Sequence, residues 1–391
     1  MFSKRRLTLM VIAVAVTCFF LWLFGRKLVE NWPHARDAFA AVITSGSWVW
    51  LIPATAMMFL VFLLTGWRWQ IIMRPLARPG YWPLFSATSI GFMLNCILPL
   101  RLGELARAAV LAARRGRSRL SDNGRVGRRD IGIGAALATI VVERLFDLLG
   151  IVTISAVGLL WLVWGTSAPI GESHSVRLLT IFMAAMALLC IAFLAFMFFR
   201  PHWARGIVMA CARCVPAAGR AAVMKVLDSF MDGLGAIRTV RQGLIVLALS
   251  MLHWAMMGMM VYLTSLCFAD QTFAGAGGAA RFDIGVPGAF VIQAFQAVAV
   301  SLPQAPGFLG THQAATLETA RLILGDDSTG IAGAYAIVLW GVSVLPVILL
   351  GFICLWAEGL SIGQVRDLAR RGENDGDQPG GSSDSSAPTD G

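Results

Sequence analysis

Long runs of apolar residues alternate with short, arginine-rich polar segments along most of the chain. Six of these runs approach or exceed the ~20 apolar residues that a membrane-spanning helix needs. The pattern therefore predicts an all-α, polytopic integral membrane protein with about six spanning helices. We expect these helices at 7–24, 47–66, 145–165, 177–199, 244–267 and 330–357.

Two further apolar regions, 84–113 and 286–323, are interrupted by proline and glycine. The interruptions fall at 99–103 and 303–310, so each region holds two helical pieces that are too short to cross alone. Non-helical backbone at membrane depth is tolerated only inside protein or beside a water-filled cavity. We therefore predict two re-entrant helical hairpins whose broken tips lie near the middle of the bilayer.

The basic residues indicate the orientation. If the N-terminus lies inside, most of the 32 lysines and arginines fall in segments on that side, including Arg68, Arg74 and Arg78. This is the positive-inside pattern. It predicts a bacterial inner-membrane protein with both termini in the cytoplasm, and it explains the net charge of +10 without nucleic acid.

The same orientation makes the two hairpins enter from opposite faces, as they would in an inverted repeat. A faint echo supports a repeat, because Leu-Pro-x-x-x-Gly occurs at both 98–103 and 302–307. The alternative is a chance similarity of two Pro/Gly breaks.

The composition, with 57% hydrophobic and 14% charged residues, favours one membrane domain over 1–360 and leaves no room for a separate soluble catalytic domain. Within it, 200–243 is expected to be a basic cytoplasmic loop with an interfacial amphipathic helix. The Gly/Ser/Asp-rich stretch 373–391 is expected to be a disordered cytoplasmic tail.

Charged residues cluster at the first hairpin. Arg101, Glu104 and Arg107 are spaced by three and share one face of a helix, although Arg101 can instead lie on the unwound tip. A charge at the bilayer centre costs roughly 2.5–3.5 kcal/mol on insertion scales, so these side chains need partners.

A second cluster, Glu143, Arg144 and Asp147, begins the third predicted span. The two clusters together hold three arginines and three acids, so their charges cancel. We predict that the carboxylates of the second cluster face the arginines of the first. One reading is that these pairs only join helices. The other is that an arginine is free to hold an anionic headgroup, whose phosphate oxygens suit its planar fork.

The second hairpin carries no charge from Pro287 to Leu317. Its prolines and glycines free backbone amides and carbonyls that can line a cavity. His312 is more simply a hydrogen-bonded residue between helices than a proton relay, and Gln293 and Gln296 are simplest as interhelical partners.

Enzyme signatures are missing from the sequence: it has no GxSxG, HExxH or Walker A motif. Cys211 and Cys214 form a lone CxxC without a second pair of ligands. We therefore predict no catalytic residue, no cofactor and no metal.

At these residues the chain resembles the family named for the transmembrane region of lysylphosphatidylglycerol synthase, also described as flippase-like. The family pattern has an Asn, then Pro-x-Arg-x-Gly-Glu-x-x-Arg, then Glu-Arg-x-x-Asp, and late in the chain Pro-Gly-Gly-x-Gly-x-x-Glu. The matching residues here are Asn95, Pro99, Arg101, Gly103, Glu104, Arg107, Glu143, Arg144, Asp147, Pro306, Gly307 and Gly310. The last segment departs twice, since Phe308 replaces a Gly and Gln313 replaces the Glu.

The resemblance implies a lipid-handling membrane domain without the aminoacyl-transferase domain that follows it in full synthases. Stand-alone members, including a hopanoid-associated subset of similar size, look like translocases or accessory proteins. We therefore expect a translocase for an anionic lipid or lipid-linked intermediate, whose headgroup binds Arg101 or Arg107, with membrane lipids as partners. The alternatives are a membrane-embedded enzyme that uses Glu104, Glu143 or Asp147 as a base, and an accessory subunit that recruits a lipid-biosynthesis partner. The residues expected to line the headgroup cavity are those matching residues together with Pro303, His312 and Gln313.

Overall fold

The computed structural model describes residues 4–77, 79–98, 103–121, 133–165, 239–275, 278–301 and 306–365, with a few isolated positions between 181 and 196. The predicted span at 177–199, most of the predicted loop at 200–243 and the predicted tail at 373–391 lie outside these residues, apart from those isolated positions and the start of α10. Pro99, Arg101 and Pro303 also lie outside them.

The chain is almost entirely helical over the described residues. A first group of four helices comprises α3 (Leu51–Met73), α4 (Tyr81–Ile97), α5 (Gly103–Ser121) and α6 (Ile133–Trp164). A second group comprises α10 (Val240–Ser265), α11 (Gly285–Ser301), α12 (Thr311–Leu324) and α13 (Thr329–Ala357). Each group is therefore a long helix, two shorter helices around a break, and another long helix.

The remaining elements lie outside these two groups in the sequence. Two helices precede them, α1 (Lys4–Glu30) and α2 (Trp32–Thr44). Strands β1 (Thr272–Gly275) and β2 (Gly278–Arg281) form an antiparallel hairpin after α10. Short 3-10 turns are η1 (Ser47–Trp50), η4 (Leu266–Phe268), η5 (Pro306–Phe308) and η6 (Asp326–Ser328).

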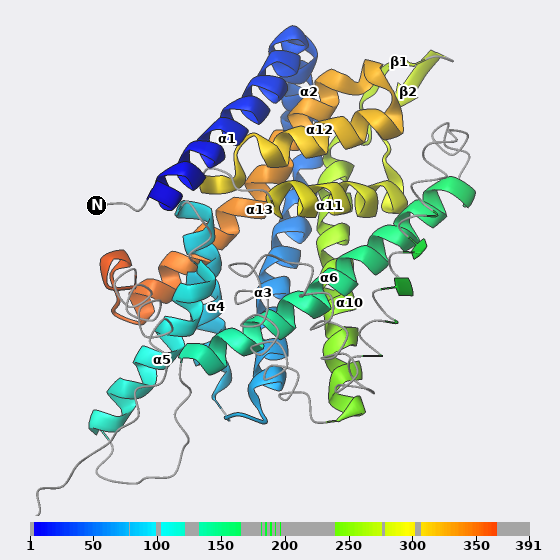
Figure 1. The fold of residues 1–391 in the computed structure, drawn as a ribbon. Helices are drawn as coiled ribbons and strands as arrows, with labels where there is room; N and C mark the ends of the chain where they lie inside the picture. The colour runs from blue at the N-terminus through cyan, green and yellow to red at the C-terminus, as the bar shows by residue number, and fades with distance from the viewer. Residues whose placement is uncertain are drawn as a thin grey trace, which may run out of the picture.

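The two groups pack against each other symmetrically, so that equivalent helices make equivalent contacts. Helix α3 packs on α10, its equivalent, and the two run side by side through the centre of the molecule (Figure 1). Helix α4 packs on α13, and the equivalent pair, α11 and α6, packs likewise. Helix α4 packs on α5, and their equivalents, α11 and α12, pack on each other in the same way. Swapping the two groups therefore leaves the pattern of helix contacts unchanged.

The repeat is inverted, because its equivalent central helices run antiparallel. The turn η1, just before α3, contacts η4, just after α10. At the opposite end, Gln242 Nε2 near the start of α10 donates to the carbonyl of Ile71 near the end of α3, at 3.1 Å. The start of each helix therefore lies beside the end of the other.

Four helices within the described residues are long and apolar enough to cross a membrane: Ser47–Met73, Ala136–Trp164, Val240–Phe268 and Asp326–Ala357. They correspond to four of the predicted spans, and the predicted span at 7–24 lies within α1. The protein is an all-α, multi-pass membrane protein. That the hairpins are re-entrant stays a prediction, since no membrane is part of the structure.

Two helix boundaries differ from the prediction in a way that matters for the site. We expected α3 to end near residue 66 and placed Arg68 in a cytoplasmic segment, but α3 continues to Met73 and Arg68 is buried within it. We expected the third span to start at residue 145, but α6 begins at Ile133 and encloses Glu143 and Arg144. Both errors arose because a search for apolar runs stops at the first charge, whereas ion pairs between helices let the helix continue.

Candidate functional site

Arg68 lies at the centre of a buried ionic cluster. Its guanidinium donates to both oxygens of Asp147, with Nη1–Oδ1 at 2.5 Å and Nη2–Oδ2 at 3.1 Å. Nη2 also donates to Glu143 Oε1 at 3.2 Å, and Nη1 donates to Ser250 Oγ at 2.9 Å. The Arg68 side chain is 1% exposed. Arg68 therefore joins α3 to α6 and to α10 from inside the helix bundle.

Arg107, from α5, holds the other side of Glu143. Its Nη1 and Nη2 donate to Glu143 Oε1 and Oε2 at 3.1 and 2.9 Å, which is a bidentate pair. The guanidinium carbon of Arg107 lies 3.8 Å from the ring centroid of Trp69, whose Nε1 donates to Thr139 Oγ1 at 3.0 Å. Glu143 is completely buried, so both arginines serve to neutralise it.

Arg144 and Glu104 form the accessible edge of the cluster. Their side chains are 39% and 42% exposed, and Arg144 Nε lies 3.2 Å from Glu104 Oε1. Arg144 also approaches Asp147 at 3.5 Å and Glu143 at 3.6 Å, and its guanidinium lies 5.6 Å from the ring of Phe92. Arg144 is therefore the least enclosed of the three described arginines in the cluster.

The predicted contact between the carboxylates of the second cluster and the arginines of the first is present for Glu143, which pairs with Arg107. Asp147 instead pairs with Arg68, which belongs to neither sequence cluster, and Glu104 pairs with Arg144 in the opposite sense. The described part of the cluster is neutral, because three arginines (68, 107 and 144) balance three acids (104, 143 and 147). Arg101, which was one of the arginines counted from the sequence, lies outside the described residues and would add one positive charge.

The junction of α4 and α5 brings Arg107 to this cluster. Asn95 Oδ1 accepts a hydrogen bond from Gly103 N at 2.8 Å, which joins the end of α4 to the start of α5. A β carbon built on Gly103 would overlap the carbonyl oxygen of Gly91. Asn95 and Gly103 therefore act first as structural residues that let the two helices approach.

The second hairpin turns through backbone that favours glycine. Gly307, Phe308 and Gly310 all have positive φ, at 75°, 57° and 82°. Trp340 Nε1 on α13 donates to the carbonyl of Gly307 at 2.7 Å and anchors this turn. Pro306 begins the turn and is exposed.

Polar side chains in this hairpin bind one another across the two helices. Gln313 Oε1 accepts from Gly310 N at 2.8 Å and caps the start of α12. Gln296 Nε2 on α11 donates to Thr316 Oγ1 on α12 at 2.7 Å, as expected of an interhelical partner. His312 is buried, and its Nδ1 has no hydrogen-bond partner among the described residues.

The two hairpins meet at their broken ends. The turn η5 contacts α4, and a β carbon built on Gly307 would lie 4.0 Å from the carbonyl oxygen of Cys96, one residue before the end of α4. The ionic groups lie on the first hairpin and on α3 and α6, while the turn of the second hairpin, which contacts the end of α4, is uncharged.

Sequence reasoning missed several polar residues around the cluster, namely Arg68, Trp69, Thr139, Ser250 and His253. A helical period could have indicated Arg68, because it lies on the same face as Leu64 and Ile72, which are buried where α3, α6 and α10 meet. Ser250 on α10 carries no comparable signal, since serine is ordinary in a spanning helix, whereas His253 could have been noticed as an ionisable residue within a predicted span.

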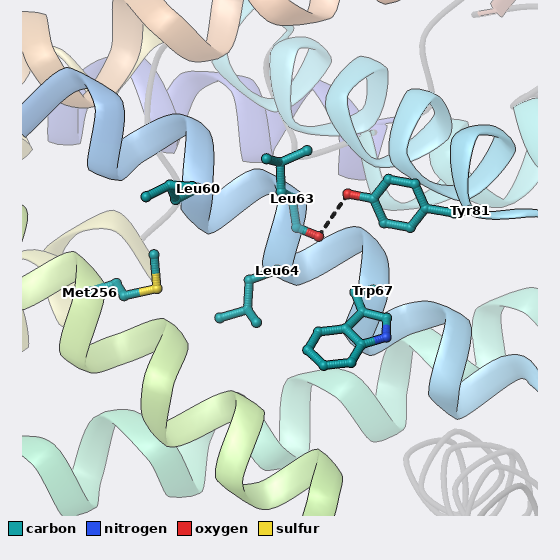
Figure 2. Close-up of a pocket in the computed structure, with 6 residues that line it drawn as sticks. All are labelled: Leu60, Leu63, Leu64, Trp67, Tyr81 and Met256. Carbon is teal, nitrogen blue, oxygen red and sulfur yellow. Dashed lines mark hydrogen bonds between the residues drawn. The ribbon is translucent and has the colours of Figure 1, made fainter.

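A separate groove of about 410 Å³ runs along the outside of α3 (Figure 2). It is lined by Leu60, Leu63, Leu64, Trp67, Tyr81 and Met256. The hydroxyl of Tyr81 donates to the carbonyl of Leu63 at 2.9 Å. The groove offers no charge for a headgroup and suits hydrocarbon.

No group of three or more histidine, cysteine or acidic side chains within the described ranges is placed to hold a metal ion.

The sequence matches the family described as the lysylphosphatidylglycerol synthase TM region over residues 10–351. The chain belongs to this family. No curated protein and no solved structure matches it. Membership identifies a membrane protein related to lipid handling, and it fits the multi-pass helical fold.

The two departures from the family pattern have different local consequences. Phe308 stands where the family pattern has glycine and adopts a φ of 57°, which a residue with a β carbon adopts at some cost. Gln313 stands where the pattern has glutamate and keeps the acceptor oxygen that caps α12. The chain thus keeps the hydrogen bond at this position without the charge.

Proposed function

We propose that this protein moves an anionic lipid, or an anionic lipid-linked intermediate, between the leaflets of the membrane. The observation that carries the proposal is an ionic cluster between membrane helices in which Arg144 is 39% exposed while Arg68 and Arg107 are enclosed. A charge kept at such depth is costly and usually functional. The lipid-handling character of the family points in the same direction.

The headgroup is proposed to bind Arg144 and Arg101. Arg144 presents part of its guanidinium, and an arginine fork suits phosphate oxygens. Arg101 precedes the start of α5 by two residues, which favours a place near the same tip. Arg107, the other arginine first considered for this role, is already held by Glu143 and Trp69, so we assign it to positioning.

The second hairpin is proposed to supply weaker, uncharged contacts that permit release. Gly307, Gly310 and the prolines at 303 and 306 interrupt its backbone, and His312 and Gln313 supply polar groups. Binding must be weak enough at one step for the lipid to leave, as in other transport sites. The acyl chains would stay in the bilayer, against apolar surfaces of the protein such as the groove along α3.

The cytoplasmic side is proposed to be the end where α3 stops and α10 starts. The described residues at this end include the exposed Arg74 and Arg241, and the basic segments 114–129 and 200–238 adjoin it in the sequence. The opposite end carries Asp270, Asp283 and Asp326 beside a few arginines. This orientation follows the positive-inside rule and leads to an inner membrane with both termini inside.

Leaflet exchange in liposomes tests the proposal. The protein would be reconstituted with fluorescent phosphatidylglycerol, which is anionic, or phosphatidylcholine, which is zwitterionic. We expect exchange of the anionic probe by the native chain, and a loss of about tenfold in Arg101→Ala and Arg144→Gln, since each removes a charged hydrogen-bond donor.

Arg36→Gln is the matched control. Arg36 lies on α2, its side chain is 68% exposed, and its partner is the adjacent Asp37. The variant loses the same charge but should exchange lipid as the native chain does. Equal exchange rates in all four proteins would remove both arginines from the mechanism, and the absence of exchange by the native chain would refute translocation.

A further inference from the structure

The charge balance of the cluster depends on a residue outside the motifs of the sequence analysis. Without Arg68, the described cluster would hold two arginines against three acids, and its net charge would be negative. Arg68 comes from α3, whereas the charged family-pattern residues lie on the first hairpin and on α6. The neutrality of the described cluster is therefore set from a neighbouring helix.

The contact distances show how Arg68 affects Arg144. Arg68 contacts both oxygens of Asp147, at 2.5 and 3.1 Å, and Glu143 at 3.2 Å. Arg144 approaches the same two carboxylates only at 3.5 and 3.6 Å. Asp147 and Glu143 thus make their closer contacts with buried arginines, and their contacts with Arg144 are longer.

The position of Arg68 is fixed by the helix behind it. Ser250 Oγ on α10 accepts from Nη1 at 2.9 Å, and next to it His253 Nδ1 lies 3.2 Å from Thr65 Oγ1. The Ser250 contact helps to hold the guanidinium where it meets the acids of α6. A buried arginine with such fixed partners cannot turn toward a ligand at the exposed edge, where Arg144 and Glu104 lie.

We propose that Arg68 is a positioning residue that makes the site selective for anionic lipids. By neutralising Glu143 and Asp147 it leaves the guanidinium of Arg144 available to a phosphate. The inference rests on the proposed function, since it assumes that the lipid binds at Arg144. It predicts that the preference for anionic over zwitterionic lipid rises when the net charge of the cluster becomes more positive and falls when it becomes more negative, whichever buried residue is changed.

Lipid binding to the purified full chain tests this directly. Native mass spectrometry would compare phosphatidylglycerol with phosphatidylcholine of the same acyl chains. Arg68→Gln should weaken phosphatidylglycerol binding about tenfold, because Arg144 is then drawn to the unneutralised acids. Asp147→Asn should strengthen it. The double variant Arg68→Gln/Asp147→Asn should return close to the native value, and phosphatidylcholine binding should change little throughout.

A merely structural role predicts a different pattern. If Arg68 only joins helices, Asp147→Asn breaks the same contact and should weaken binding too, which would overturn the inference. Arg68→Lys keeps the charge without the fork and should keep the preference for phosphatidylglycerol; a loss as large as that of Arg68→Gln would also overturn it. If Arg68→Gln does not fold, Asp147→Asn and Arg68→Lys still decide the question.

The same proteins in the leaflet-exchange assay separate this inference from the proposed function. Binding that follows the cluster charge, without lipid exchange by the native chain, would refute translocation and support the role of Arg68. Exchange by the native chain, with binding that ignores the cluster charge, would support translocation and refute the role of Arg68.

Discussion

At the scale of single residues, the site is organised around one carboxylate. Glu143 is completely buried and accepts hydrogen bonds from Arg68 and Arg107, which come from two different helices. Burying three charges together is tolerable because each finds an opposite charge at hydrogen-bonding distance. Removing one arginine leaves a buried carboxylate whose charge is less well neutralised. The loss in the free energy of unfolding should therefore be much larger than for a surface ion pair.

Arg107→Gln should therefore destabilise the protein by about 3–5 kcal/mol, the usual cost of breaking a buried pair. The measurement is the free energy of unfolding in mixed micelles. Arg26→Gln is the control, because the Arg26–Glu30 pair is exposed (61% and 53%) and surface pairs contribute little to stability. Equal losses in the two variants would show that Arg107 is not enclosed as described.

The sequence was sufficient to predict part of this site. Opposite charges in two short motifs indicated that Arg107 and Glu143 would meet, because unpaired charges are too costly in a bilayer. It could not assign Arg68, since an arginine near the end of an apolar run resembles an interfacial residue. Only the packing of α3 against α6 and α10 distinguishes the two cases.

At the scale of elements, proline and glycine predicted where both hairpins break, and the helices end and restart close to the expected positions. The start of α6 was not predictable from apolar runs, because Glu143, Arg144 and Asp147 interrupt the run within it. The contact between the second hairpin and α1 also had no sequence signal. It depends on Gly310, where a β carbon would lie 2.8 Å from the backbone nitrogen of Leu21.

Gly310→Ala and Gly325→Ala form a matched pair for this contact. Both glycines have positive φ, at 82° and 95°, so both substitutions strain the backbone. A β carbon at Gly325 meets nothing within 4 Å, whereas one at Gly310 collides with α1. Overpacking should therefore destabilise Gly310→Ala by about 1–3 kcal/mol more than Gly325→Ala. The measurement is the thermal transition temperature, which should fall clearly further in Gly310→Ala. Equal shifts would contradict the packing of α1 on the hairpin.

At the scale of the whole molecule, the two inverted halves have the same arrangement of helices but differ in their charged side chains. The described first half supplies all six charges of the ionic cluster. The second half supplies Ser250 and His253 beside Arg68 and Thr65, and an uncharged hairpin whose turn contacts α4. Inverted repeats with broken helices are a recurring transporter design, with substrate sites near the middle of the bilayer. The asymmetry suits a site that binds strongly from one side and releases on the other.

The orientation of the halves can be tested by labelling introduced cysteines in intact cells. Ser45 and Asp326 are exposed at the end that we place outside, and Arg74 and Arg241 are exposed at the other end. An impermeant maleimide should label Ser45→Cys and Asp326→Cys in intact cells, but Arg74→Cys and Arg241→Cys only after permeabilisation. The reverse pattern would invert the topology and place the charged hairpin on the outer side.

The most direct measurement of the central claim is an experimental structure of the protein in lipid nanodiscs containing phosphatidylglycerol. The account predicts a lipid phosphate within ~4 Å of the Arg144 guanidinium, the usual limit for an ion pair. Arg68 and Arg107 should still be held by Glu143 and Asp147. Lipid phosphates found only around the outer surface, with Arg144 bound to acids alone, would contradict it.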